Sequence, residues 1–194
     1  MKIYFVRHGK TSYNGPTPTI TGQKDIPLSE DGVQEAESIA SEIPRECTTM
    51  YSSDLERCRD TAQIINKKLE IPLVLDARLR ERDFGSLTGS EWFGLSDEMR
   101  EKDIKQEYDY RPYGGEFVDD VKARVFASIE DIRKNQNGKD VLVVTHAGVI
   151  RLLLHFLANN TGSQIHNASV HLFEFPDTLG KTMSSGSSSD LGVL

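Results

Sequence analysis

The sequence lacks most features of a secreted, membrane-spanning or nucleic-acid-binding protein. Its only cysteines are Cys47 and Cys58, which are too few for a disulfide scaffold and typical of buried thiols in a reducing compartment. No apolar run approaches the length of a membrane span, and Met1 and Lys2 lead into a short apolar segment without the pattern of a signal peptide. We therefore expect a cytoplasmic protein without membrane contacts.

An excess of positive charge is also absent. The chain has 23 lysines and arginines against 30 aspartates and glutamates, which gives a formal net charge of −7. This balance excludes a general attraction to nucleic acid, so an anionic ligand must be held by a local cluster of cations. The chain does have 194 residues and a hydrophobic content of 37%. Both values fit one soluble domain with a sizeable core.

Short apolar segments alternate with amphipathic segments along the chain. The strand candidates are residues 2–6, 47–51, 71–76, 141–144 and 169–175. Apolar residues recur at helical spacing in residues 29–43, 54–69 and 117–134 and in the segment after His146. Ser29 is the expected N-cap of the first helix. The alternation predicts an α/β fold, a three-layer α/β/α sandwich around a mainly parallel sheet.

Residues 83–116 interrupt this alternation. They carry glycines, aromatic residues and charges without a regular period, so we expect an insertion of short helices that forms a small helical cap. Residues 1–179, with this insertion, are predicted to form a single domain. Residues 180–194 are rich in glycine and serine and are predicted to be a flexible tail.

Two segments far apart in the sequence share one plan. Residues 3–9 (IYFVRHG) and residues 141–148 (VLVVTHAG) are each a buried strand that ends in a histidine followed by a small residue. Ligands of open α/β sheets bind beyond the carboxyl ends of the strands, so His8 and His146 are expected at the same rim. If the two strands are neighbours, the imidazoles meet there, and the helix after His146 offers N–H groups to an anion.

Cations and one acid are expected near the same rim. Arg7 precedes the first histidine, and Arg57 lies near the start of a helix that follows a strand. A guanidinium offers planar, bidentate donors that match phosphate oxygens. Glu81 follows another strand candidate. A histidine nucleophile, a second histidine, cationic clamps and a carboxylic acid suffice for phosphoryl transfer without a metal.

Six ordered blocks of the chain resemble the histidine phosphatase superfamily, also called the phosphoglycerate mutase-like family. They cover nearly all of the chain from residue 3 to about residue 151. The blocks are VRHGKTSYN, GQKDIPLSEDG, YSSDLERCRDTA, LRERDFGSLTG, PYGGEFVDDVKARV and VVTHAGVIR. An isolated RHG would be a weak signal, but six blocks in family order are a specific one.

The resemblance implies a role for each matching residue. His8 would be the nucleophile that becomes phosphohistidine, and Glu81 would protonate the leaving oxygen and then help to deprotonate the attacking water. The phosphoryl group and its transition state would be bound by Arg7, Arg57 and His146. The remaining substrate contacts would come from Asn14, Thr21, Gly22 and the backbone N–H of Ala147. No metal or other cofactor is implied, because the arginines take the place of a metal as the charge clamp.

The chemistry sets conditions on two of these residues. His8 must attack as a neutral imidazole whose other ring nitrogen is oriented by an acceptor. Glu81 must begin protonated, so we expect its pKa to be raised by burial, by the negative substrate, or by both. These conditions predict a bell-shaped pH profile on the acid-to-neutral side and an activity that survives EDTA.

Four functions are compatible with the resemblance, and the first is favoured. The first is a phosphatase that acts on a small phosphomonoester, similar to the α-ribazole phosphatase and broad-specificity phosphatase branch. The alternative is a 2,3-bisphosphoglycerate-dependent phosphoglycerate mutase, which usually has a longer insertion than residues 83–116. A phospho-ligand-binding module without catalysis is disfavoured because no essential residue is missing. A protein phosphatase acting on phosphohistidine is also less favoured, since the shortest proteins of that type lack the cap.

Overall fold

A five-stranded sheet forms the centre of the protein in the computed structural model, which describes residues 1–176. The strands are β1 (Lys2–Arg7), β2 (Thr49–Ser52), β3 (Leu73–Leu75), β4 (Val141–Thr145) and β5 (Val170–Glu174). Their order across the sheet is β3-β2-β4-β1-β5. The first four of these are mutually parallel, and only β5 runs antiparallel to its neighbour β1. The prediction of a mainly parallel sheet is confirmed.

Strands β1 and β4 lie side by side at the centre of the sheet. Arg7 is paired with Thr145 at their carboxyl ends, so His8 and His146 leave the sheet at the same height. Every residue of β4 is buried, as are four of the six residues of β1. Central parallel strands are covered on both faces, which explains why both read as continuous apolar runs.

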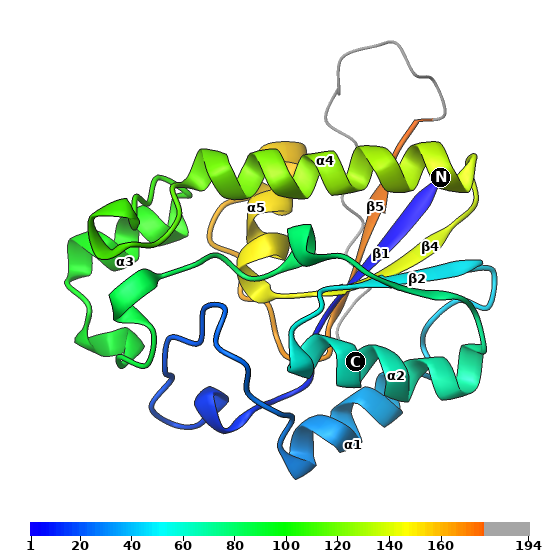
Figure 1. Cartoon of the computed structure of the whole chain (residues 1–194), viewed down its shortest axis with the longest axis horizontal. Coiled ribbons are helices and arrows are strands. Elements are labelled where there is room, and N and C mark those ends of the chain that lie inside the picture. Colours follow the sequence, from blue (N-terminus) through cyan, green and yellow to red (C-terminus); the bar gives the residue numbers. More distant parts are fainter. Residues whose placement is uncertain (177–194) are drawn as a thin grey trace.

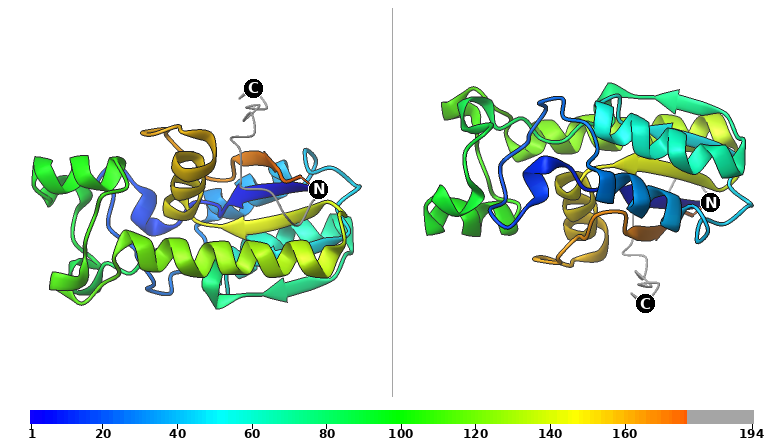
Figure 2. Two further views of the ribbon diagram at one scale, coloured as in Figure 1. Left: turned by 90° about the horizontal axis from the view of Figure 1, so that it is seen from above. Right: turned by 90° about the horizontal axis from the view of Figure 1, so that it is seen from below.

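Helices cover both faces of the sheet (Figure 1). Helices α1 (Glu30–Ile39) and α2 (Glu56–Leu69) pack on one face. Helices α4 (Val118–Gln136) and α5 (Ala147–Ala158) pack on the other. The view from above shows α4 and α5 on one side of the sheet, and the view from below shows α1 and α2 on the other (Figure 2). The three-layer α/β/α sandwich predicted from the sequence is therefore confirmed.

The side chains of β1 show how the core is divided between the two faces. Ile3 and Phe5 belong to the apolar cluster beneath α4 and α5. Tyr4 and Val6 belong to the cluster beneath α1 and α2. Successive residues of a strand point to opposite faces, so one apolar strand serves both layers.

Helix α1 is shorter than the sequence predicts. Ser29 is its N-cap, as expected, and accepts a hydrogen bond from the Gly32 N–H at 3.2 Å. The helix ends at Ile39, however, four residues before the predicted end at Ile43. Ile43 is buried, but it precedes Pro44, and a residue before proline is disfavoured in the helical conformation.

Residues 83–116, which we call the cap segment, fold into the short helices that the sequence predicts. They contain α3 (Asp97–Ile104) and three 3-10 turns. The cap segment lies beyond the carboxyl ends of the strands (Figures 1 and 2). This is the end of the sheet at which His8 and His146 follow β1 and β4. The predicted tail, residues 180–194, lies outside the described residues. Within residues 1–176, no helix is both long and apolar enough to cross a membrane.

A close backbone approach between the segment after β1 and helix α1 gives the first testable prediction. A Cβ atom on Gly32 would lie 2.1 Å from the Lys10 carbonyl oxygen, far inside van der Waals contact. Gly32→Ala is expected to lower the free energy of unfolding by about 1–3 kcal/mol, because the backbone must shift to accommodate the methyl group. Urea denaturation measures this difference.

Gly15→Ala is the matched control, since the nearest atom to its Cβ would be the Ser12 carbonyl oxygen at 3.9 Å. This control should unfold within about 0.5 kcal/mol of the wild type. Equal stabilities of the Gly32→Ala and Gly15→Ala variants would show that the approach is not a tight one.

Candidate active site

His8 directly follows β1 and is held in one orientation. Its Nδ1 lies 2.7 Å from the carbonyl oxygen of Gly9, which fixes the proton on Nδ1 and leaves the lone pair on Nε2. Thr61 accepts the Gly9 N–H at 3.1 Å and donates to the Arg57 carbonyl at 2.7 Å, so α2 orients the backbone that orients the imidazole. The acceptor that the sequence analysis required for the second ring nitrogen is therefore the Gly9 carbonyl.

His8 is neutral in this site. Burial, followed by the charges of Arg57 and Arg7, holds its pKa well below the usual value of 6.5. Only 6% of the residue is exposed, so solvent does little to stabilise a charged ring. A neutral imidazole with a lone pair on Nε2 is the form that can act as a nucleophile.

Arg57 lies in the first turn of α2 and connects His8 to the loop that carries Gly22 and Lys24. Its Nε lies 3.3 Å from His8 Nε2. Its Nη1 and Nη2 donate to the carbonyl oxygens of Lys24 at 2.9 Å and Gly22 at 2.8 Å. Gly22 is thereby brought to the site, whereas the neighbouring Thr21 hydroxyl donates weakly to the Thr19 carbonyl at 3.4 Å. Arg57 is only 1% exposed, so its guanidinium is fixed before a ligand arrives.

His146 meets His8 as the shared strand plan predicts. The two ring centroids are 5.3 Å apart. His146 Nε2 lies 3.0 Å from the Ser53 hydroxyl and 3.3 Å from the Cys58 sulfur. Burial, then the charges of Arg57 and His8, holds the pKa of His146 well below its usual value. Ala147, the other residue predicted here, begins α5 immediately after this histidine.

Arg7 and Asn14 are tied to the segment that follows α5. Arg7 Nη1 donates to the Ile165 carbonyl at 2.6 Å, while its buried Nε has no hydrogen-bond partner. The Asn167 amide donates to the His8 carbonyl at 3.1 Å and lies 3.4 Å from Asn14 Oδ1. Burial and then the charge of Arg151 lower the pKa of Arg7 to about 10. Ile165 and Asn167 were missed in the sequence because they belong to an irregular loop outside the six blocks.

Glu81 faces the start of α5. Its two carboxylate oxygens accept the N–H groups of Gly148 at 3.1 Å and of Arg82 at 3.0 Å. Burial alone would raise the pKa of this carboxyl, but the charges of Arg82 and Arg151 and these two hydrogen bonds outweigh burial, so the pKa is lowered. The expectation that burial raises the pKa of Glu81 is therefore wrong for the ligand-free protein.

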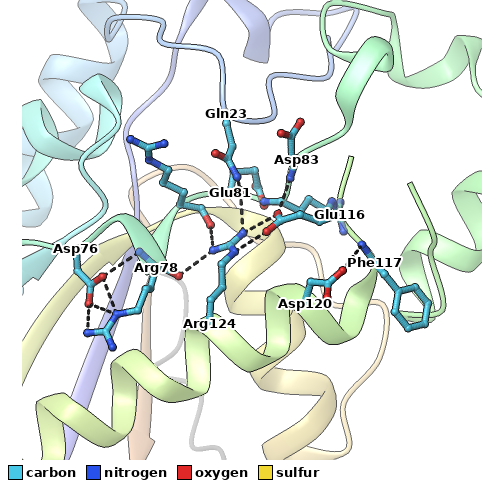
Figure 3. A network of polar contacts seen from close by, with 11 residues as sticks. Gln23, Asp76, Arg78, Glu81, Asp83, Glu116, Phe117, Asp120 and Arg124 are labelled. Carbon is cyan, nitrogen blue, oxygen red and sulfur yellow. Dashed lines mark hydrogen bonds and ion pairs between the residues drawn. The ribbon is translucent and has the colours of Figure 1, made fainter. Parts of the chain in front are cut away.

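Arg124 of α4 holds the backbone that carries Glu81 (Figure 3). Its guanidinium donates to the carbonyl oxygens of Arg78 at 2.8 Å, Arg80 at 2.7 Å and Glu81 at 3.0 Å. Glu116 accepts the Arg124 Nε–H at 2.8 Å and keeps this guanidinium in place.

Gln23 adds a second donor to the Glu81 carbonyl, at 3.1 Å (Figure 3). These supporting residues lie outside the set of site residues predicted from the sequence. Glu116 and Arg124 stand in the block PYGGEFVDDVKARV, eight residues apart, and this spacing was the available signal.

The site carries more positive than negative charge. Three arginines lie near Glu81, namely Arg7, Arg57 and Arg151. Burial lowers the pKa of each guanidinium, and the nearby Glu81 carboxylate partly opposes this by raising it. Three guanidinium groups around one carboxylate form the local cationic cluster that a chain of net charge −7 needs to bind an anion. Within residues 1–176, no group of three or more histidine, cysteine, aspartate or glutamate side chains is arranged to hold a metal ion.

Comparisons with known proteins point to one family. The chain matches the model of the histidine phosphatase superfamily (branch 1) over residues 3–183. A metal-independent phosphoserine phosphatase of Arabidopsis thaliana is 35% identical over 184 residues, which span 91% of this chain and 77% of that protein. Phosphoglycerate mutase-like protein 4 of the same plant is 34% identical over 186 residues, spanning 91% of this chain and 80% of that protein.

Solved structures show the same fold. A phosphoglycerate mutase from Thermus thermophilus matches with a TM-score of 0.77 and 29% identity over 91% of this chain and 94% of that chain. A mycobacterial glucosyl-3-phosphoglycerate phosphatase in complex with VO3 matches with a TM-score of 0.79 and 26% identity, over 88% of this chain and 90% of that chain.

The contact between Glu81 and α5 leaves no room for a side chain on Gly148. A Cβ atom there would lie 2.1 Å from Glu81 Oε1. Gly148→Ala is expected to push the carboxylate aside and to lower kcat/KM for an alkyl phosphomonoester by about a hundredfold, since a misplacement of roughly 1 Å in an active site has that cost. Steady-state phosphate release measures the loss.

Gly94→Ala serves as the control, because its Cβ would have no neighbour closer than the Glu91 Cβ at 3.8 Å. Wild-type turnover by Gly148→Ala would mean that the position of Glu81 does not matter for the reaction.

Proposed function

The chain belongs to the histidine phosphatase superfamily, and we propose that it hydrolyses small phosphomonoesters through a phosphohistidine on His8, without a metal or other cofactor. One observation carries this proposal. His8 is neutral, its Nδ1 is held by the Gly9 carbonyl at 2.7 Å, and its Nε2 lies beside Arg57 at 3.3 Å. A nucleophile in this state, next to a preorganised guanidinium, is suited to in-line attack on a phosphoryl group.

In the first step, His8 Nε2 attacks phosphorus and the ester oxygen leaves on the opposite side. Arg7, Arg57 and His146 bind the three remaining phosphoryl oxygens, where charge spreads in the transition state. Glu81 gives its proton to the leaving oxygen, so the alcohol departs neutral. Because the pKa of Glu81 is lowered in the free protein, this proton arrives with the monoanionic ester, whose own second pKa is about 6.

In the second step, water attacks phosphohistidine and the N–P bond breaks. The Glu81 carboxylate accepts a proton from the water, and inorganic phosphate leaves with the oxygen that the water supplied. His8 returns to the neutral imidazole with its proton on Nδ1. Glu81 therefore acts as an acid in one step and as a base in the next. It then passes the proton taken from water to the departing phosphate, so the carboxylate returns to its ionised starting state.

Two named relatives support a small phosphorylated metabolite as the substrate. One is a phosphoserine phosphatase and the other a glucosyl-3-phosphoglycerate phosphatase. The cap segment, residues 83–116, is expected to limit the site to small esters. We also propose that residues 1–179 form a single domain and that the protein is cytoplasmic, which the free buried thiols of Cys47 and Cys58 support.

A phosphoglycerate mutase is the second candidate, favoured by the names of a curated relative and of a matching structure. Such an enzyme uses the same phosphohistidine but returns the phosphoryl group to the sugar acid. Isomerisation of 3-phosphoglycerate in the presence of 2,3-bisphosphoglycerate, without release of phosphate, would establish this alternative.

The direct test is phosphate release from a panel of phosphomonoesters with EDTA present, including phosphoserine, 3-phosphoglycerate and p-nitrophenyl phosphate. The wild type is expected to turn over at least one ester and to form an acid-labile phosphoenzyme. His8→Ala is expected to lose both. His155→Ala is the control, because this histidine contacts the Thr161 hydroxyl at 3.0 Å on α5, outside the site. Undiminished turnover by His8→Ala would refute the phosphohistidine mechanism.

The pH dependence gives a separate prediction. Burial and neighbouring arginines keep the pKa of His8 well below 6.5, so acid does not disable the nucleophile until far below that value. The proton for the leaving group, in contrast, is lost as the pH rises above the second pKa of the ester, about 6. We expect kcat/KM for an alkyl phosphomonoester to fall on the alkaline side of this value. A rate that stays flat or rises up to alkaline pH would contradict the assignment of Glu81.

A further inference from the structure

One buried ion pair connects the cap segment to the active site. Arg82, the residue after Glu81, pairs with Asp103 of α3. Arg82 Nη2 donates to Asp103 Oδ2 at 2.8 Å, and Nη1 lies 2.8 Å from Oδ1. The two side chains are 2% and 1% exposed, so water does not screen the pair.

Aromatic residues fix this pair from several sides. The Arg82 guanidinium carbon lies 4.8 Å from the ring centroids of both Phe84 and Tyr108. The Tyr110 hydroxyl donates to Asp103 Oδ1 at 2.9 Å. Arg82 is therefore held by the cap segment both through its charge and through the faces of its guanidinium.

The same arginine contacts Glu81 through its backbone. The Arg82 N–H donates to Glu81 Oε1, so the orientation of the carboxylate depends on where Arg82 is held. The charge of Arg82 is also shared between two acids, since Asp103 and Glu81 both act on it. While Asp103 neutralises Arg82, Glu81 is not its principal partner.

We propose that Asp103 is a positioning residue that acts on Glu81 through Arg82. By taking up the Arg82 charge, Asp103 leaves the Glu81 carboxyl free to exchange its proton with the substrate. If Asp103 lost its charge, Glu81 would become the counter-ion of Arg82, and its carboxylate would be held ionised against that guanidinium. This inference rests on the proposed role of Glu81 as the proton donor.

Other charged and titratable groups also face Glu81. They are Arg151 of α5, Arg7 at the end of β1, Arg57 and Cys58 of α2, and Tyr108 of the cap segment. A substitution at Asp103 leaves all of these in place. Asp103 also acts electrostatically on Arg151 and Tyr108, but its side-chain contacts are the ion pair with Arg82 and the hydrogen bond from Tyr110. We therefore expect the main change at Glu81 to pass through Arg82, and the double variant described below tests this.

The test compares two leaving groups. Asp103→Asn keeps the shape of the side chain and an acceptor for the Tyr110 hydroxyl. For an alkyl phosphomonoester that the wild type hydrolyses, kcat is expected to fall by about tenfold or more, a part of the 10²–10⁴-fold that a general acid contributes. For p-nitrophenyl phosphate, whose leaving group needs no proton, kcat should stay within about threefold of the wild type. The alkaline limb of the kcat profile for the alkyl ester, which reports the proton held in the enzyme–substrate complex, should move to lower pH.

Two further variants separate the proposal from simple damage to the fold. Asp97→Asn removes an exposed carboxylate from the same helix, and kcat for both esters should stay at the wild-type value. The double variant Arg82→Met with Asp103→Leu removes both charges, which a folded core tolerates better than one unpaired charge. With Arg82 gone, the alkaline limb should move to higher pH, opposite to the single variant. The double variant also provides the test if Asp103→Asn does not fold.

The outcomes distinguish this inference from the proposed function. If Asp103→Asn loses kcat equally for both esters with no shift of the pH profile, Asp103 is purely structural and the inference is overturned. The inference is also overturned if the alkaline limb of the kcat profile for the alkyl ester stays at the wild-type pH in the double variant. If Glu81→Gln itself shows no dependence on the leaving group, the failure lies in the role of Glu81 and thus in the proposed function.

Discussion

The parallel pairing of β1 with β4 is the constraint on which the rest of this structure depends. Their register places Arg7 opposite Thr145, and the His8 N–H continues the ladder to the Thr145 carbonyl at 3.0 Å. A shift by one residue would turn His8 to the other face of the sheet, away from Arg57 and His146. Because both strands are buried on two faces, that register is strongly specified by the core. The stability of the core therefore fixes the geometry of the site.

The polar groups of the site are held mainly by backbone atoms rather than by one another. The Gly9 carbonyl orients His8, and the Gly148 N–H donates to the Glu81 carboxylate. The carbonyl oxygens of Gly22 and Lys24 accept hydrogen bonds from Arg57. Gly9 follows β1 closely and Gly148 lies in the first turn of α5, while the loop carbonyls of Gly22 and Lys24 are held by the buried Arg57. Such an arrangement is preorganised, and preorganised donors stabilise a transition state without reorganising during the reaction.

The positions of the two histidines could be predicted from the sequence, whereas the charges that act on Glu81 could not. The apolar runs of β1 and β4 were sufficient to place His8 and His146 together, since parallel strands share one carboxyl edge. The charge around Glu81 could not be obtained in this way. Arg151 lies 70 residues away (151 − 81) and is brought close only by the fold. Arg82, whose charge lowers the pKa of Glu81 most, is the next residue in the sequence, but its effect on the carboxylate also depends on the fold. Burial was foreseen and these compensating cations were not, so the direction expected from burial is wrong for the ligand-free protein.

The charges around Glu81 would couple the binding of a phosphate ester to the protonation of this carboxyl. In the free protein, Arg82 and Arg151 hold the pKa of Glu81 below its usual value although burial opposes them. A phosphomonoester brings negative charge to the same place, and negative charge near a carboxyl favours its protonated form. In the proposed mechanism, the bound ester would therefore oppose the arginines and favour the protonated form of Glu81 in the complex in which the acid is needed. Release of phosphate would remove that negative charge, so the charges of Arg82 and Arg151 would again favour the ionised carboxylate.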